Sequence, residues 1–147
     1  MPREETESRY ELVLQREALE AAIQATPFAQ LIGAKLDLYE AGLVELSVPF
    51  STKITQHHGF AHGAVLGFLA DSACAWASAS IGGDVVTAEY KVNFVGPAKG
   101  EELVGRGKVI KLGGRQITAQ AEVFAVADGE RTLVAVALST IARISRR

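Results

Sequence analysis

One stretch of the chain, residues 57–80, combines the residue types that could do chemistry. It opens with a glycine-containing turn that carries His57 and His58, and it continues into a helix-forming segment whose single formal charge is Asp71. Burying a carboxylate costs free energy unless the group is paired or hydrogen-bonded. Asp71 is therefore either satisfied by its neighbours or kept for chemistry, where a carboxylate offers general-base or nucleophilic catalysis.

The apolar segment that follows the turn, residues 63–81, is long enough to be weighed as a membrane span. Asp71 near its middle would cost about 2.5–3.5 kcal/mol on insertion. The second half is rich in alanine and serine, and no lysine or arginine flanks either end. We therefore expect a helix that protein buries on nearly all sides, with small residues that let another element approach closely.

Composition limits the class of protein. A length of 147 residues fits one domain, and 48% hydrophobic with 22% charged residues is typical of a globular chain. The net charge of −2 gives no basic surplus for binding nucleic acid. The polar, acidic N-terminus lacks the pattern of a secretory signal, and the single Cys74 cannot form an internal disulfide. We expect a cytoplasmic protein with no nucleic-acid or membrane partner. We also expect no metal, because no carboxylate or cysteine has ligand spacing to the histidines.

The hydrophobic pattern predicts a helix, two strands, a long helix and four more strands. The helices are expected at 10–25, ended by Pro27, and at 63–81, and the strands at 35–39, 44–48, 86–94, 103–112, 117–123 and 133–144. In the strand 86–94, alternation places Thr87 on a polar face with Glu89, Lys91 and Asn93. This order predicts an α+β fold in which an antiparallel sheet wraps around the apolar central helix.

The turn over residues 56–64 and the aspartate that follows it resemble the hotdog-fold thioesterases, and among them the phenylacetyl-CoA thioesterase (PaaI) type. That group has a His-Gly-Gly turn with an aspartate nine positions after the histidine. His62 and Asp71 keep this spacing, whereas Ala64 stands in the place of the second glycine. The resemblance implies a hotdog fold and thioester hydrolysis.

The resemblance covers residues 28–143. It implies a hotdog domain over residues 28–147, preceded by an N-terminal helical segment over residues 1–27, within a single domain overall. The implied substrate is an acyl-CoA with an aromatic or medium-sized acyl group, and no cofactor is expected. The implied assembly is a homo-oligomer, either a dimer or a dimer of dimers.

The resemblance also assigns roles to individual positions. The Gly63 N–H would polarise the thioester carbonyl, and Asp71 would act as general base or nucleophile. Gln56 would assist at the same carbonyl, Thr87 would help to position water, and His62 would fix the turn by a hydrogen bond. The expected substrate contacts are His57, His58, Phe60 and Ala64 at the pocket, and the hairpin turn Gly113, Gly114 and Arg115 at the CoA phosphates.

The spacing between two of these residues carries a further expectation. Gly63 and Asp71 are eight residues apart, which is roughly 12 Å along a helix. One thioester carbon can hardly lie within reach of both groups of the same chain. We therefore expect Asp71 to face the Gly63 of a second subunit across a two-fold axis, in an obligate dimer.

Two other functions remain open at this point. One is a non-catalytic protein that binds acyl-CoA or has a regulatory role, against which the retained Asp71 argues. The other is a hotdog dehydratase that acts on acyl-carrier protein. Such enzymes usually enter the helix through a histidine followed by proline and glycine, which this chain lacks.

Overall fold

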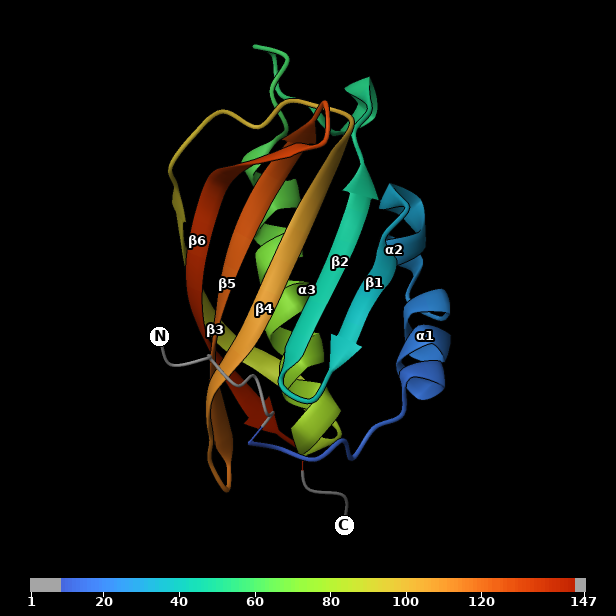
Figure 1. Ribbon diagram of the computed structural model, residues 1–147, viewed down its shortest axis with the longest axis vertical. Coiled ribbons are helices and arrows are strands. Elements are labelled where there is room, and N and C mark those ends of the chain that lie inside the picture. The colour runs from blue at the N-terminus through green and yellow to red at the C-terminus, as the bar shows by residue number, and fades with distance from the viewer. Residues whose placement is uncertain (1–8, 145–147) are drawn as a thin grey trace, which may run out of the picture.

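The computed structural model describes residues 9–144, so the expectation about a secretory signal in residues 1–8 lies outside the described residues. Six strands form one antiparallel sheet in the order β1-β2-β4-β5-β6-β3. The strands are β1 Lys35–Glu40, β2 Leu43–Pro49, β3 Val85–Phe94, β4 Glu102–Leu112, β5 Gln116–Ala127 and β6 Glu130–Arg143. Figure 1 shows the sheet curving around the long helix α3, Gly63–Gly82. The predicted α+β hotdog arrangement is confirmed.

Helix α3 forms the core together with the sheet and packs chiefly against β4 and β5. At two glycines of β4 the strand backbone touches the helix backbone. A Cβ atom on Gly107 would lie 2.2 Å from the carbonyl oxygen of Ala73, and one on Gly105 would lie 2.7 Å from that of Leu69. The small residues of α3 and the glycines of β4 thus allow the close approach that the sequence predicts.

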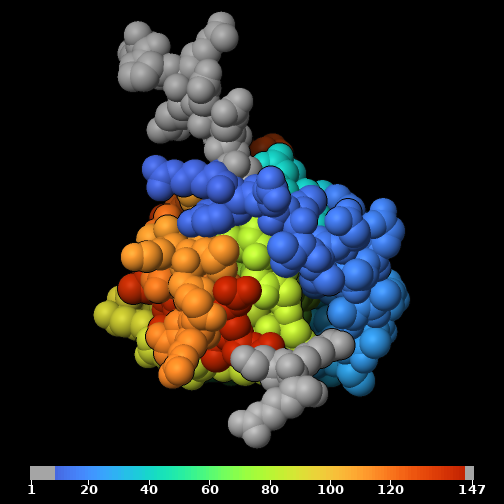
Figure 2. Space-filling view, turned by 90° about the horizontal axis from the view of Figure 1, so that it is seen from below, coloured from blue at the N-terminus to red at the C-terminus, as the bar shows by residue number. Residues whose placement is uncertain are grey.

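Helix α3 has the length and hydropathy of a membrane span, but 67% of its most apolar window is buried inside the protein. The remaining stripe is open between the two edges of the sheet, and its partly exposed or exposed residues are Gly63, Ala64, Phe68, Asp71, Ala75, Trp76 and Gly82. Figure 2 views the end of the molecule at which α3 finishes, and the last turns of α3, in yellow-green, are visible there between the blue N-terminal segment and the orange β4–β5 hairpin. The helix is therefore less completely buried than the sequence predicts.

The N-terminal helix differs from its prediction. Helix α1 runs from Arg16 to Gln24, and a second short helix, α2, runs from Pro27 to Ile32. Pro27 begins this helix because the first helical position needs no N–H donor. Residues 10–15 are not helical, since the N–H groups of Val13 and Leu14 donate to the carbonyl oxygen of Ser80 near the end of α3. In Figure 1, α1 and α2 lie beside β1.

Strand β3 is an edge strand. One of its sides pairs with β6 over the whole length from Val85 to Phe94. Its other side has no strand partner among the described residues. An unpaired edge is a surface on which another strand can pair.

Candidate active site

The N-terminal end of α3 presents one backbone N–H that is free to bind a ligand. The Nδ1 atom of His62 accepts a hydrogen bond from the Ala64 N–H at 3.0 Å, and the His62 carbonyl oxygen accepts from Val65 and Leu66. Among the described residues, the Gly63 N–H has no acceptor. N–H groups in the first turn of a helix favour a partly negative atom. A carbonyl oxygen could therefore bind there, while His62 holds the turn.

Asp71 is held by a hydroxyl group of β3. Thr87 Oγ1 donates to Asp71 Oδ1 at 2.6 Å. The register of β3 against β6 shifts between Thr87 and Glu89, so Ala88 forms a bulge. A bulge interrupts the alternation of side chains between the two faces. Thr87 therefore faces α3, as Tyr90 does, and the prediction that it shares a polar face with Glu89 was wrong.

The carboxylate of Asp71 is only partly buried, because it lies on the open stripe of α3. Thr87 occupies Oδ1, and Oδ2 has no hydrogen-bond partner among the described residues. The group is thus anchored on one oxygen and accessible on the other. A water molecule can reach the free oxygen, which is the arrangement that a general base needs.

One face of α3 carries Gly63, Gly67 and Asp71 at successive turns. Two aromatic side chains of β3 lie against the glycines. The ring of Phe94 is 3.0 Å from the position that a Cβ atom of Gly63 would occupy, and the hydroxyl of Tyr90 is 3.1 Å from that of Gly67. Sequence reasoning did not place either aromatic residue at the site. The available signal was a pair of glycines four apart in the helix and a pair of aromatic residues four apart in the next strand.

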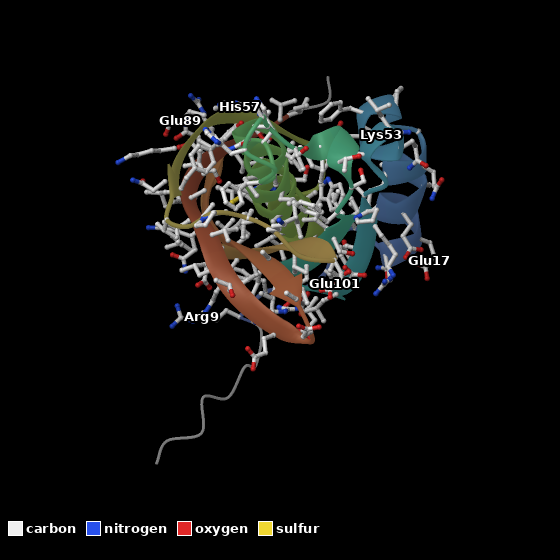
Figure 3. The ribbon with its side chains drawn as sticks, turned by 90° about the horizontal axis from the view of Figure 1, so that it is seen from above. Arg9, Glu17, Lys53, His57, Glu89 and Glu101 are labelled. Carbon is white, nitrogen blue, oxygen red and sulfur yellow. The ribbon has the colours of Figure 1, made fainter. Side chains whose placement is uncertain are left out.

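The loop before α3 carries Gln56, His57, His58 and Phe60, which the sequence predicts at the site, and it lies at the N-terminal end of α3. Gln56 Oε1 accepts a hydrogen bond from the His58 N–H, and Gln56 Nε2 has no acceptor among the described residues. The rings of His57 and His58 are exposed, with centroids 4.0 Å apart, and Phe60 is half-buried. Figure 3 shows His57 at the rim of the end where α3 begins.

The hairpin turn over residues 113–115 lies at the opposite end of α3. Arg143 donates to the carbonyl oxygen of Gly113 at 3.1 Å and to that of Gly82, the last residue of α3, at 3.4 Å. The structure therefore does not bring this turn close to the Asp71 of the same chain. Any shared role of the two would need a second chain.

Cys74, one turn after Asp71, is not a candidate nucleophile. Burial raises the pKa of its thiol to about 11, even though a hydrogen bond with Ser139 lowers it, and the charge of Asp71 raises it further. The thiol is consequently protonated at neutral pH and unreactive. Within residues 9–144, no three histidine, cysteine or acidic side chains are grouped so that they could hold a metal ion.

The geometry gives a first testable prediction, for the change Thr87→Ala. Removing the hydroxyl frees the carboxylate of Asp71 to rotate, so we expect kcat for thioester hydrolysis to fall by about 10–100-fold, less than on loss of the aspartate itself. Steady-state kinetics of the variant measure this, and Thr140→Ala, on the adjacent strand β6, is the control. An unchanged rate for Thr87→Ala would remove this residue from the site.

Comparison with known proteins identifies the family. The family model of the thioesterase superfamily matches residues 58–132. A candidate esterase of Saccharolobus solfataricus is 32% identical over 111 residues, which are 74% of this chain and 72% of that protein. A solved structure of a thioesterase family protein from Silicibacter pomeroyi is 35% identical, covers 84% of this chain and 93% of its own, and has a TM-score of 0.82.

The E. coli PaaI protein of the phenylacetic acid degradation operon has the same fold. Its structure gives a TM-score of 0.79 at 22% identity and covers 88% of this chain and 92% of its own. At that identity the likeness concerns the fold alone. The family model and the relative from Saccharolobus solfataricus lead to one conclusion: the chain belongs to the thioesterase superfamily, and its fold is the hotdog fold.

Proposed function

We propose that this protein hydrolyses an acyl-CoA to a free acid and CoA. The observation that carries the proposal is the state of Asp71. Within residues 9–144, its carboxylate is fixed on one oxygen by Thr87 and has no partner on the other, and it lies on the open stripe of a helix whose first N–H has no acceptor. A fixed base beside a free backbone donor is what attack of water on a thioester needs.

In the proposed reaction Asp71 acts as general base. It takes a proton from water as the water oxygen attacks the thioester carbon. The Gly63 N–H and the amide of Gln56 donate to the oxygen that becomes negative. The tetrahedral intermediate then collapses, the carbon–sulfur bond breaks, and the proton held by Asp71 passes to the departing CoA sulfur. Base catalysis of this kind contributes about 10²–10⁴-fold to the rate.

The active site would be completed by a second copy of the chain. Within one helix the Gly63 and Asp71 backbones are separated by about 12 Å. The free edge of β3 carries apolar side chains that a partner would cover: Val86 is 52% exposed, Tyr90 42% and Phe94 55%. Antiparallel pairing of two β3 edges would extend the sheet and bring two α3 helices together in opposite directions.

The same dimer would give the far hairpin turn a role in binding CoA. If Gly63 faces the partner's Asp71, the partner's α3 continues for eleven more residues, about 16 Å beyond Gly63. The turn over residues 113–115 is tied to that end of α3 by Arg143. Arg115 would then lie within reach of the phosphates of a CoA whose long pantetheine arm extends from the thioester.

Two phenylalanines support an apolar acyl group. The rings of Phe28 in α2 and Phe68 in α3 meet edge to face, with centroids 5.3 Å apart at 71°. Phe68 lies three residues before Asp71 on the open stripe, and Phe28 is 52% exposed. These rings would form an apolar wall beside the carboxylate, which suits an aromatic or medium-chain acyl group.

A panel of acyl-CoA thioesters with detection of the free thiol tests the proposal. We expect thiol release, fastest with aromatic or medium-chain acyl groups. A 3-hydroxyacyl thioester belongs in the panel, because its conversion to an unsaturated product without thiol release would indicate a dehydratase. Tight binding of acyl-CoA with no turnover of any member would indicate a non-catalytic binding protein.

The acyl wall gives a second prediction, for Phe28→Ala. We expect kcat/KM for the best aromatic or medium-chain substrate to fall by about 10-fold relative to acetyl-CoA, because only the larger acyl group contacts the ring. Leu31→Ala, at an exposed apolar position of the same short helix, is the matched control. Equal losses for acetyl-CoA and the larger substrate would place Phe28 outside the acyl site.

A further inference from the structure

Tyr90 of β3 directs its hydroxyl group toward α3. Its oxygen lies 3.1 Å, and its nearest ring carbons 3.7 and 3.8 Å, from the position that a Cβ atom of Gly67 would occupy. The side chain is 42% exposed, and its hydroxyl has no hydrogen-bond partner among the described residues. At this exposure the hydroxyl is accessible to a water molecule, to which it can donate or from which it can accept a hydrogen bond.

Gly67, beside which this hydroxyl lies, is one helical turn before Asp71 on the same face of α3. Side chains of a helix point toward its N-terminus and cover the preceding turn. The carboxylate of Asp71 therefore extends back over the turn that contains Gly67, where the Tyr90 hydroxyl lies. Gly67 has no side chain to fill the space between them. Oδ1 of Asp71 already accepts from Thr87, so Oδ2 is the oxygen that remains available.

We propose that Tyr90 is a positioning residue that holds the attacking water against Asp71. The proposal rests on the proposed thioesterase function and deepens it. The water donates one hydrogen to Asp71 Oδ2 and the other to the phenolic oxygen of Tyr90. A lone pair of the water oxygen is then directed at the thioester carbon. During attack the first hydrogen passes to Asp71 as a proton, and Tyr90 keeps its own proton throughout.

This assignment separates the tasks of the two hydroxyl groups of β3. Thr87 donates its hydroxyl hydrogen bond to Oδ1 of Asp71 and so fixes the orientation of the base. Tyr90 makes no such bond and acts on the water. The bulge at Ala88 is what allows both residues to face α3 although they are three positions apart.

The test is Tyr90→Phe, which removes one oxygen and keeps the ring that packs on Gly67. We expect kcat to fall by about 10–100-fold, as for other groups that position a reactant, with KM within about two-fold of wild type. The matched control is Tyr39→Phe, which also removes a hydroxyl. That hydroxyl donates to the Leu14 carbonyl oxygen, away from the site, so this variant should keep wild-type kinetics.

A second measurement separates a role on the water from a role in stability. In an Asp71→Asn background the base no longer uses that water, so adding Tyr90→Phe should lower the residual rate by less than about two-fold. The inference would be overturned if Tyr90→Phe lowered the rate of the Asp71→Asn enzyme by the same factor as that of wild type, or if Tyr90→Phe alone kept the wild-type kcat. Either result would leave the role of Asp71 and the proposed function in place. If the wild-type protein releases no thiol from any acyl-CoA, the proposed function fails and this inference fails with it.

Discussion

Asp71→Asn is expected to lower kcat for acyl-CoA hydrolysis by about three to four orders of magnitude, the upper range of what a general base contributes. The asparagine keeps the shape of the side chain, and its amide oxygen can still accept the hydrogen bond that Thr87 donates to Asp71 Oδ1. What is lost is the ability of the free oxygen to take a proton from water. Thiol release under saturating substrate measures the change.

The same variant should fold normally. The carboxylate lies on the open stripe of α3 and is only partly buried, so neutralising it leaves no buried group unpaired. The thermal midpoint of the variant should therefore equal that of wild type or exceed it. Asp37→Asn, on the exposed part of β1, is the matched control and should keep full activity. Near wild-type turnover by Asp71→Asn would make Asp71 a structural residue and would refute the proposed mechanism.

The sequence predicted the helices and strands well, but it did not predict which side chains of β3 face the site. The limits of α3 were predicted to within one residue, because glycines mark both ends of one continuous apolar segment. The small residues of α3 correctly indicated a close neighbour, which is the β4 backbone at Gly105 and Gly107. Strong periodicity and chain breakers are local properties, so a single sequence can reveal them.

The face of Thr87 could not be predicted in this way. Strict alternation assigned it to the side of Glu89, and one extra residue, Ala88, reversed that assignment. A bulge arises from how a strand fits its neighbour β6, and the hydrophobic pattern of β3 alone does not contain that information. The same error concealed Tyr90, which alternation placed on the face opposite Thr87 although both face α3.

The open stripe of α3 shows a second limit. Composition predicted a helix buried on nearly all sides, because Asp71 is its only charge. The stripe is left open because the sheet ends at β1 on one side and at β3 on the other. Apolar groups on an open stripe next to an unpaired strand edge suit an interface between chains. The apolar composition of α3 suggested that one chain buries the helix completely. The same composition is compatible with a helix whose open stripe is buried between two copies of the chain.

Mixing two inactive variants is expected to restore activity if each site is shared between chains. The Gly63→Val side chain would displace the Phe94 ring, which already lies 3.0 Å from the Cβ position, and would block access to the N–H. In a mixed dimer with an Asp71→Asn chain, one of the two sites pairs an intact Gly63 with an intact Asp71. Random exchange makes half of the dimers mixed, so an equal mixture should reach about a quarter of wild-type activity.

The reciprocal mixture tests the same arrangement from the opposite direction. When a chain that carries both Gly63→Val and Asp71→Asn is mixed equally with wild type, both sites of every mixed dimer are inactive, because each site takes one residue from the doubly substituted chain. Activity should then fall to about a quarter of that of wild type at the same total concentration, whereas sites contained within one chain would retain about half. Subunit exchange is verified independently with differently tagged chains. No recovery in the first mixture together with half activity in the second, or a fully active monomer in sedimentation, would show that Gly63 and Asp71 of one chain act alone.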